Sequence, residues 1–162
     1  MGDPVGGDRQ GSRLYFDDLH VGQRFTSGTH RLDEARIKTF AAEFDPQPFH
    51  LDERTAKTAF FGELVASGWH TAAITMRLLV DGGLPLAGGI IGAGGEISWT
   101  KATRPGDVLN VVSEVEEMTP SRSRADRGMV RVRSETRNQR DEVVQVLVSR
   151  LIVPRRGAPA QT

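Results

Sequence analysis

The stretch FDPQPFH, residues 44–50, holds the residue types best suited to acid–base chemistry. Its carboxylate, Asp45, and its imidazole, His50, lie five positions apart, with two prolines between them. Because proline fixes its own φ and disfavours the α region at the residue before it, the loop is predicted to be extended and stiff. A stiff loop can hold the pair in one geometry, so that Asp45 takes a proton from water and His50 shares or returns it near neutral pH. The amide of Gln47 and the ring of Phe49 would orient this water and exclude solvent.

A helix is predicted to lead into this loop. Asp33 is a suitable N-cap for a helix that runs to about Phe44. Apolar residues recur on one face of this helix, at Ile37, Phe40, Ala41 and Phe44. The two prolines then stop it. The alternative for residues 44–50 is therefore a helix end followed by a proline-rich turn with no catalytic role, and residue types alone do not decide between these interpretations.

A second helix is predicted over residues 69–80, where apolar residues recur at helical spacing. These residues are Trp69, Ala72, Ala73, Met76, Leu79 and Val80. Ser67 can cap the start of the helix, and Gly82-Gly83 can end it. Few charges interrupt the helix, so we expect it to be buried on several sides. We interpret Trp69 and Trp99 as core residues.

The rest of the chain has the pattern of strands. Four are predicted from alternating apolar and polar residues, over residues 91–99, 108–118, 128–136 and 143–153. Short turns between consecutive strands imply an antiparallel sheet, and one long apolar helix covered by a curved sheet is the economical α+β packing. We expect one domain over residues 14–154, with a disordered leader over 1–13 and a disordered tail over 155–162.

Glycines cluster at residues 88–95, before and within the first predicted strand. A dinucleotide-binding loop needs a preceding strand and a following helix, and here the order is reversed. The glycines therefore indicate sharp bending or the close approach of another backbone, which we expect to be the central helix.

Composition excludes several classes of protein. The chain has 162 residues, and its 21 Lys and Arg balance its 21 Asp and Glu, so no basic field favours nucleic acid or an anionic membrane. The absence of cysteine excludes disulfides, thiolate metal sites and a cysteine nucleophile, and it fits the cytoplasmic location that we predict. No apolar run approaches the roughly 18 residues of a membrane span, and no signal-peptide pattern begins the chain.

The motifs together resemble the MaoC-like dehydratase family, the hotdog-fold group that includes (R)-specific enoyl-CoA hydratases. The family signature is Asp, any residue, Asn, Pro, any residue and His, and residues 45–50 match it with Gln47 in place of the asparagine. Ser67-Gly68 and the RPGD turn at residues 104–107 match two further family elements, and the resemblance runs from about residue 15 to residue 153. Phe44 also departs from the family pattern, since many members have a small residue at this position. These departures bear on substrate preference and rate more than on fold.

The resemblance implies a reaction that interconverts a trans-2-enoyl-CoA and an (R)-3-hydroxyacyl-CoA. Asp45 and His50 would hold the water that attacks the β carbon, while a proton goes to the α carbon. The backbone N–H of Gly68, at a helix N-terminus, would stabilise negative charge on the thioester oxygen. Ser67 is a second candidate donor, or it is only an N-cap. The resemblance implies no metal and no redox cofactor.

A coenzyme A substrate would bring phosphates, for which Arg104, Arg122 and Arg124 are candidate contacts. A solvated hairpin tip is the alternative for residues 121–127. A homodimer or a dimer of dimers is expected, because one sheet over one helix leaves edges exposed. We expect neither nucleic acid nor a membrane as partner. Hotdog proteins also include thioesterases, so a thioesterase or a non-catalytic acyl-thioester binder stays open, as do the acyl chain and its carrier.

Overall fold

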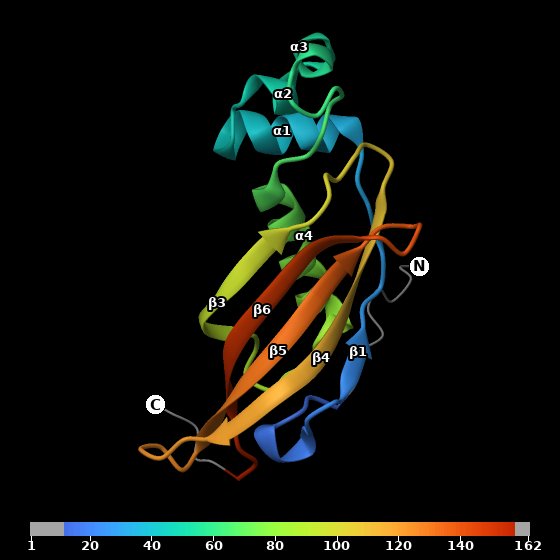
Figure 1. Cartoon of the computed structure of the whole chain (residues 1–162). Coiled ribbons are helices and arrows are strands. Elements are labelled where there is room, and N and C mark those ends of the chain that lie inside the picture. The colour runs from blue at the N-terminus through green and yellow to red at the C-terminus, as the bar shows by residue number, and fades with distance from the viewer. Residues whose placement is uncertain (1–11, 158–162) are drawn as a thin grey trace, which may run out of the picture.

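The computed structural model describes residues 12–157. One antiparallel sheet curves around a central helix, α4 (Gly68–Leu78), and the helices α1 (Glu34–Phe44), α2 (Pro48–Leu51) and α3 (Glu53–Thr58) lie beyond one end of the sheet (Figure 1). The strand order is β1-β4-β5-β6-β3, and β2 also pairs with β4. The strands are β1 (Arg24–Thr26), β2 (His30–Arg31), β3 (Ile91–Trp99), β4 (Val108–Pro120), β5 (Arg127–Arg137) and β6 (Val143–Pro154). The predicted α+β arrangement and all four long strands are confirmed.

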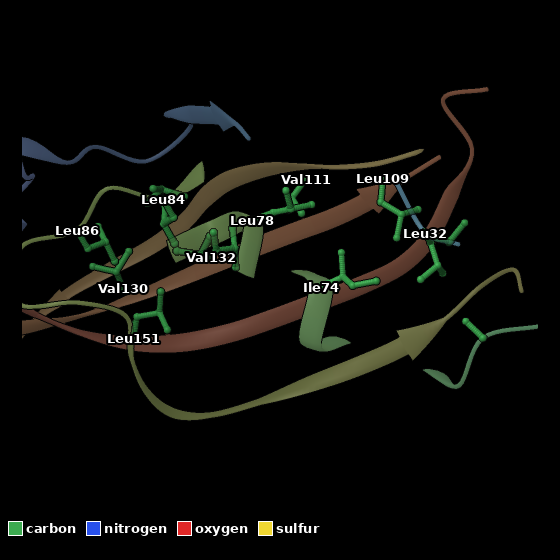
Figure 2. Close-up of a cluster of buried hydrophobic side chains, with 14 of the residues drawn as sticks. Leu32, Ile74, Leu78, Leu84, Leu86, Leu109, Val111, Val130, Val132 and Leu151 are labelled. Atoms are coloured by element: carbon green, nitrogen blue, oxygen red, sulfur yellow. The ribbon is translucent and has the colours of Figure 1, made fainter. Parts of the chain in front are cut away.

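The core lies between the concave face of the sheet and α4. Alternation along the long strands turns every second side chain inward. Figure 2 shows the strand side chains Leu109, Val111, Val130, Val132 and Leu151 beside Ile74 and Leu78 of α4. A π-helical turn, η2 (Leu79–Gly83), ends the helical segment, and Gly82 has φ 127° there, a conformation that favours glycine.

The helix α4 buries a different face from the one expected. Its buried residues are His70, Thr71, Ile74, Thr75 and Leu78. The predicted apolar stripe is instead largely exposed, with Trp69 at 58%, Met76 at 43% and Val80 at 55% exposure. A single sheet covers only one side of the helix, so the expectation of burial on several sides is wrong for one chain. The apolar stripe is left for another surface to cover.

The helices that lead to the site begin as predicted. Asp33 caps α1 (Glu34–Phe44), because its side chain accepts the backbone N–H of Arg36 at 2.8 Å. Two short helices follow, α2 (Pro48–Leu51) and α3 (Glu53–Thr58). Helix α1 contacts α4 through stacked rings of Phe40 and His70, whose centroids lie 4.5 Å apart. The loop of residues 44–50 thus follows a helix, α1, that packs against α4.

Strand β3 lies at one edge of the sheet, and within residues 12–157 it pairs only with β6. A register shift between Gly92 and Gly95 marks a bulge. A Cβ on Gly95 would lie 2.5 Å from the Val148 carbonyl oxygen of β6. The predicted close approach of another backbone is therefore present, but it is made by β6 and not by the central helix.

The two ends of the described chain meet at the far end of the sheet from helices α1, α2 and α3. Arg155 Nη2 lies 2.8 Å from an Asp17 carboxylate oxygen, and Arg156 pairs with Asp18. Residues 155–157 of the predicted tail are thus part of the described structure, while residues 1–11 and 158–162 lie outside it. Across residues 12–157, no helix combines the length and apolar character that crossing a bilayer requires.

Candidate active site

Asp45 and His50 come together as predicted. Asp45 ends α1, where its backbone N–H donates to the Ala41 carbonyl at 2.9 Å. Pro48 begins α2 with its φ already helical, and this single turn points His50 inward. The His50 Nε2 atom lies 3.3 Å from Asp45 Oδ2, with the imidazole 5% exposed and the carboxylate 16% exposed. The proline loop therefore brings a carboxylate and an imidazole into contact.

One ring nitrogen of His50 is already committed. Its Nδ1 atom lies 2.7 Å from the Val65 carbonyl oxygen. A carbonyl only accepts hydrogen bonds, so Nδ1 carries a hydrogen in this arrangement. The nitrogen that can exchange a proton is then Nε2, which faces Asp45. Sequence reasoning did not identify Val65, because a main-chain carbonyl leaves no signal in the residue type.

Asp45 is fixed by two donors. The Ser67 hydroxyl donates to Oδ2 at 2.7 Å, and the Gln47 amide donates to Oδ1 at 2.6 Å. Burial by itself raises the pKa of Asp45, but these two hydrogen bonds and the charge of protonated His50 outweigh it and leave the pKa below its usual value. The carboxylate is therefore ionised at neutral pH.

These contacts change the roles expected for Ser67 and Gln47. The Ser67 oxygen also accepts the Trp69 backbone N–H at 3.2 Å, so it caps α4 as well as holding Asp45. Its single proton is used on the carboxylate and is not free for a thioester oxygen. Gln47, expected to orient water, donates its amide to Asp45 instead. Both residues position the acid.

A cavity of about 520 Å³ opens in front of the pair. Asp45, His50 and Gly68 line it together with Phe49 and Phe61. Gly68 is the first residue of α4, so its backbone N–H has no acceptor within the helix, and the helix dipole favours negative charge there. The cavity thus has the Asp45–His50 pair and the N-terminal residue of α4 on its walls.

Two tryptophans also face this cavity. Trp69 and Trp99 line it, and their side chains are 58% and 43% exposed. Their interpretation as core residues is therefore wrong. Apolar aromatic rings predict contact with something apolar, but they do not tell a core from a pocket wall.

The three arginines expected at CoA phosphates do not converge. Arg104 lies just beyond Thr103, which lines the cavity, and pairs with Glu63. Arg122 and Arg124 lie in the β4–β5 hairpin, at the opposite end of the long strands (Figure 1). Lys101, which lines the cavity, is a nearer cation and pairs with Glu142. Within residues 12–157, no three His, Asp or Glu side chains are placed to hold a metal ion together.

An antiparallel sheet around one helix, with an Asp–His pair before that helix, defines a hotdog-fold protein with a site for acid–base chemistry. The chain matches the MaoC like domain over residues 18–138, and it belongs to this family.

Three relatives support this assignment. A crystal structure of the MaoC-like dehydratase from Rhodospirillum rubrum is 60% identical, with a TM-score of 0.88 over 90% of this chain and 99% of that one. The R-hydratase from Pseudomonas aeruginosa is 27% identical, with a TM-score of 0.73 over 93% and 94% of the two chains. The 3-hydroxybutyryl-CoA dehydratase of Methylorubrum extorquens is 32% identical over 118 residues, which cover 69% of this chain and 70% of the relative.

Proposed function

We propose that this protein is a hydratase that interconverts trans-2-enoyl-CoA and (R)-3-hydroxyacyl-CoA. One observation carries the proposal: an ionised carboxylate and an exchangeable imidazole nitrogen lie 3.3 Å apart on the wall of a cavity that Gly68, the first residue of α4, also lines. Addition of water to an unsaturated thioester can use these groups to activate water, transfer a proton and stabilise the thioester oxygen. The hydratase and dehydratase activities in the names of the relatives support the same reaction.

The residues divide the work of the reaction. Asp45 and His50 Nε2 hold one water, whose hydroxyl adds to the β carbon. The pair takes one proton from this water and delivers one proton to the α carbon. The pair therefore ends in its starting protonation state. Negative charge that develops on the thioester oxygen is met by the Gly68 N–H at the positive end of α4. Ser67, Gln47 and the Val65 carbonyl keep the pair aligned.

The test is product analysis with purified protein and a panel of trans-2-enoyl-CoA esters. Hydration removes the enone absorbance without releasing thiol, and the product should be the (R)-alcohol. Release of free CoA would instead identify a thioesterase, and intact thioester with measurable binding would identify a non-catalytic binder. Asp45→Asn is the matched control, because it keeps the side-chain shape and removes the charge.

We also propose that two copies pair into a homodimer. The free edge of β3 offers unpaired backbone groups, and the exposed stripe on α4 lies on a helix that β3 adjoins through the Trp69–Trp99 contact. A second copy could cover both features at once. Sedimentation at micromolar concentration should give the mass of a dimer or of a multiple of dimers. Met76→Asp, outside the catalytic cavity, should shift that mass toward the monomer, and a monomeric parent would refute the pairing.

Arg104 remains our proposed contact for the CoA phosphates. It lies next to the cavity wall and can exchange Glu63 for a phosphate. Arg104→Gln should raise KM for the CoA ester about threefold to tenfold and leave kcat little changed, as expected for one partly exposed ionic contact.

A further inference from the structure

Two cavities lie side by side along α4. The first contains the Asp45–His50 pair. The second, of about 350 Å³, lies between α4 and strands β3 and β6 and has a mainly apolar lining that includes Met76, Ile97 and Leu147. Trp69 lines both cavities, so its ring stands where they meet.

A second tryptophan completes the separation. Trp99 lines only the first cavity, and its ring packs edge-on against Trp69, with centroids 5.1 Å apart and planes at 81°. This is a favourable geometry for two aromatic rings. Trp99 also lies directly on the start of α4, because a Cβ on Gly68 would be 2.6 Å from its ring. The indole therefore leaves no gap beside the candidate oxyanion amide.

A buried amide fixes the orientation of Trp99. Its Nε1–H donates to Gln145 Oε1 at 3.0 Å, and Gln145 is fully buried. The other end of this amide donates to Thr75 Oγ1 at 3.0 Å, and Thr75 in turn bonds to Thr136 at 2.6 Å. An indole nitrogen can only donate, so Trp99 donates to Gln145, and Gln145 donates to Thr75. The Thr75 hydroxyl donates to the Thr71 carbonyl at 2.9 Å and therefore accepts from Thr136.

Strand register places the end of this wall. Trp99 lies opposite Gln145 on the β3–β6 ladder, and Ile97 lies opposite Leu147. Residues two apart on a strand face the same side, so Ile97 follows Trp99 on the face toward α4. The hydrogen-bonded pair Trp99 and Gln145 is thus followed, two residues along each strand, by the apolar pair Ile97 and Leu147 of the second cavity.

We propose that Trp99, fixed by Gln145 and packed on Trp69, closes the acyl end of the catalytic cavity and restricts the enzyme to short enoyl thioesters. The apolar groove beyond it is the space that a longer chain would enter without this ring. The inference rests on the proposed function for its chemistry, but the wall itself can be tested by binding alone.

Binding of S-alkyl-CoA thioethers gives a readout that requires no turnover. The parent should bind S-butyl-CoA at least as tightly as S-dodecyl-CoA. Trp99→Ala should lower the Kd for S-dodecyl-CoA about tenfold or more relative to the parent. This is the gain expected from burying about two methylene groups. Turnover should follow, with kcat/KM for trans-2-dodecenoyl-CoA rising relative to crotonyl-CoA in the variant.

Two further variants test where the chain goes and how the wall is fixed. Trp99→Ala combined with Ile97→Trp should lose the gain for S-dodecyl-CoA, because the new ring refills the groove. Gln145→Met keeps the side-chain length and removes the hydrogen bond, so it should broaden chain-length selectivity less than Trp99→Ala does.

The outcomes separate the two proposals. If the parent hydrates no enoyl-CoA but the thioether affinities change as described, the wall stands and the hydratase assignment fails. If the parent already prefers S-dodecyl-CoA, or if Trp99→Ala leaves the ratio of affinities unchanged while its circular dichroism and thermal unfolding remain cooperative, Trp99 does not limit the chain.

Discussion

Two carboxylates near the same end of the sheet, Asp45 and Asp107, accept similar hydrogen bonds but lie in different surroundings. Asp107 is 3% exposed and accepts the Arg104 backbone N–H at 2.9 Å and the Gln139 amide at 3.0 Å. Asp45 likewise accepts two hydrogen bonds, from the side chains of Ser67 and Gln47. The difference is that Asp45 also faces an imidazole and lines an open cavity, which Asp107 does not.

The comparison separates a structural carboxylate from the one that we propose to be catalytic. Burial and satisfied hydrogen bonds describe both residues, so neither property identifies an active acid. Asp107 fixes the turn of residues 104–107 between β3 and β4. Asp45 is held by Ser67 and Gln47 beside an imidazole at the cavity wall, where we propose that it acts on water. Loss of the first should cost stability, and loss of the second should cost activity.

The largest effect is expected at the catalytic pair. Asp45→Asn should lower hydration about a hundredfold or more, because the water loses its charged acceptor, while the unfolding free energy changes little. Enoyl-CoA kinetics and denaturant unfolding on the same preparation measure both. Full activity in a folded Asp45→Asn variant would remove Asp45 from the mechanism.

His50→Ala should lose activity to a similar degree, but it differs in stability. The imidazole is buried, and its removal leaves the Val65 carbonyl without its donor, at a cost of about 1–3 kcal/mol. Because both groups act on one water, the double variant should be far more active than the product of the two single losses implies. Multiplicative losses would show that the two residues act in separate steps.

Asp107→Asn should reverse the pattern. An amide presents one acceptor oxygen where two donors converge, so one hydrogen bond is replaced by a donor facing a donor. We expect a loss of about 1–3 kcal/mol in the free energy of unfolding, measured in urea, with kcat/KM within about threefold of the parent. A large loss of activity at unchanged stability would mean that this turn takes part in the reaction.

Gln47→Asn restores the residue usual in the family's signature and refines the comparison. Asn is one methylene shorter, so its amide would retreat from Asp45 by roughly 1.5 Å and weaken a bond that is 2.6 Å long in the parent. Because that bond lowers the pKa of Asp45, the pKa should rise toward its usual value. Activity should be retained within about tenfold, with the acidic limb of the pH–rate profile shifted upward. An unmoved limb would show that Gln47 does not tune the carboxylate.

The smallest effect concerns His70, a buried titratable group outside the catalytic cavity. Burial, followed by the nearby His30 and Arg36, lowers its pKa from 6.5 to about 4, with Asp33 opposing them. The unfolded chain therefore binds the proton more readily, so stability should fall as pH drops from about 6.5 toward 4 and stay level above that window. His70→Phe keeps a ring against Phe40 and should flatten this dependence, by on the order of 1 kcal/mol after solvent screening. An equally steep fall in the variant would assign the dependence to another group.

The sequence predicted the fold and the pairing of Asp45 with His50 because both depend on local patterns. Prolines and glycines mark where elements end, strand alternation survives in β4, β5 and β6, and Asp45 and His50 are near neighbours in the chain. The N-cap role of Asp33 is equally local and is confirmed. Such short-range features can be predicted from the sequence without knowing the tertiary contacts.

The parts that were missed depend on long-range contacts. The face of α4 that is buried depends on which side the sheet covers, and an apolar stripe looks the same whether a core or a second surface covers it. The link from Trp99 to Gln145 joins residues 46 positions apart through a strand register that composition does not encode. The distance between Arg104 and Arg122 follows from the length of β4, which separates two basic segments that the sequence places close together.

Because Trp99 packs closely on Gly68, we expect the first turn of α4 to move with β3. A close-packed contact with no free space transmits displacement instead of absorbing it. Since Trp99 ends β3, a twist of that strand would shift the Gly68 amide. Strand β3 would then transmit its motion to the site. A second copy bound along the edge of β3 would reduce the thermal motion of that amide in both subunits at once.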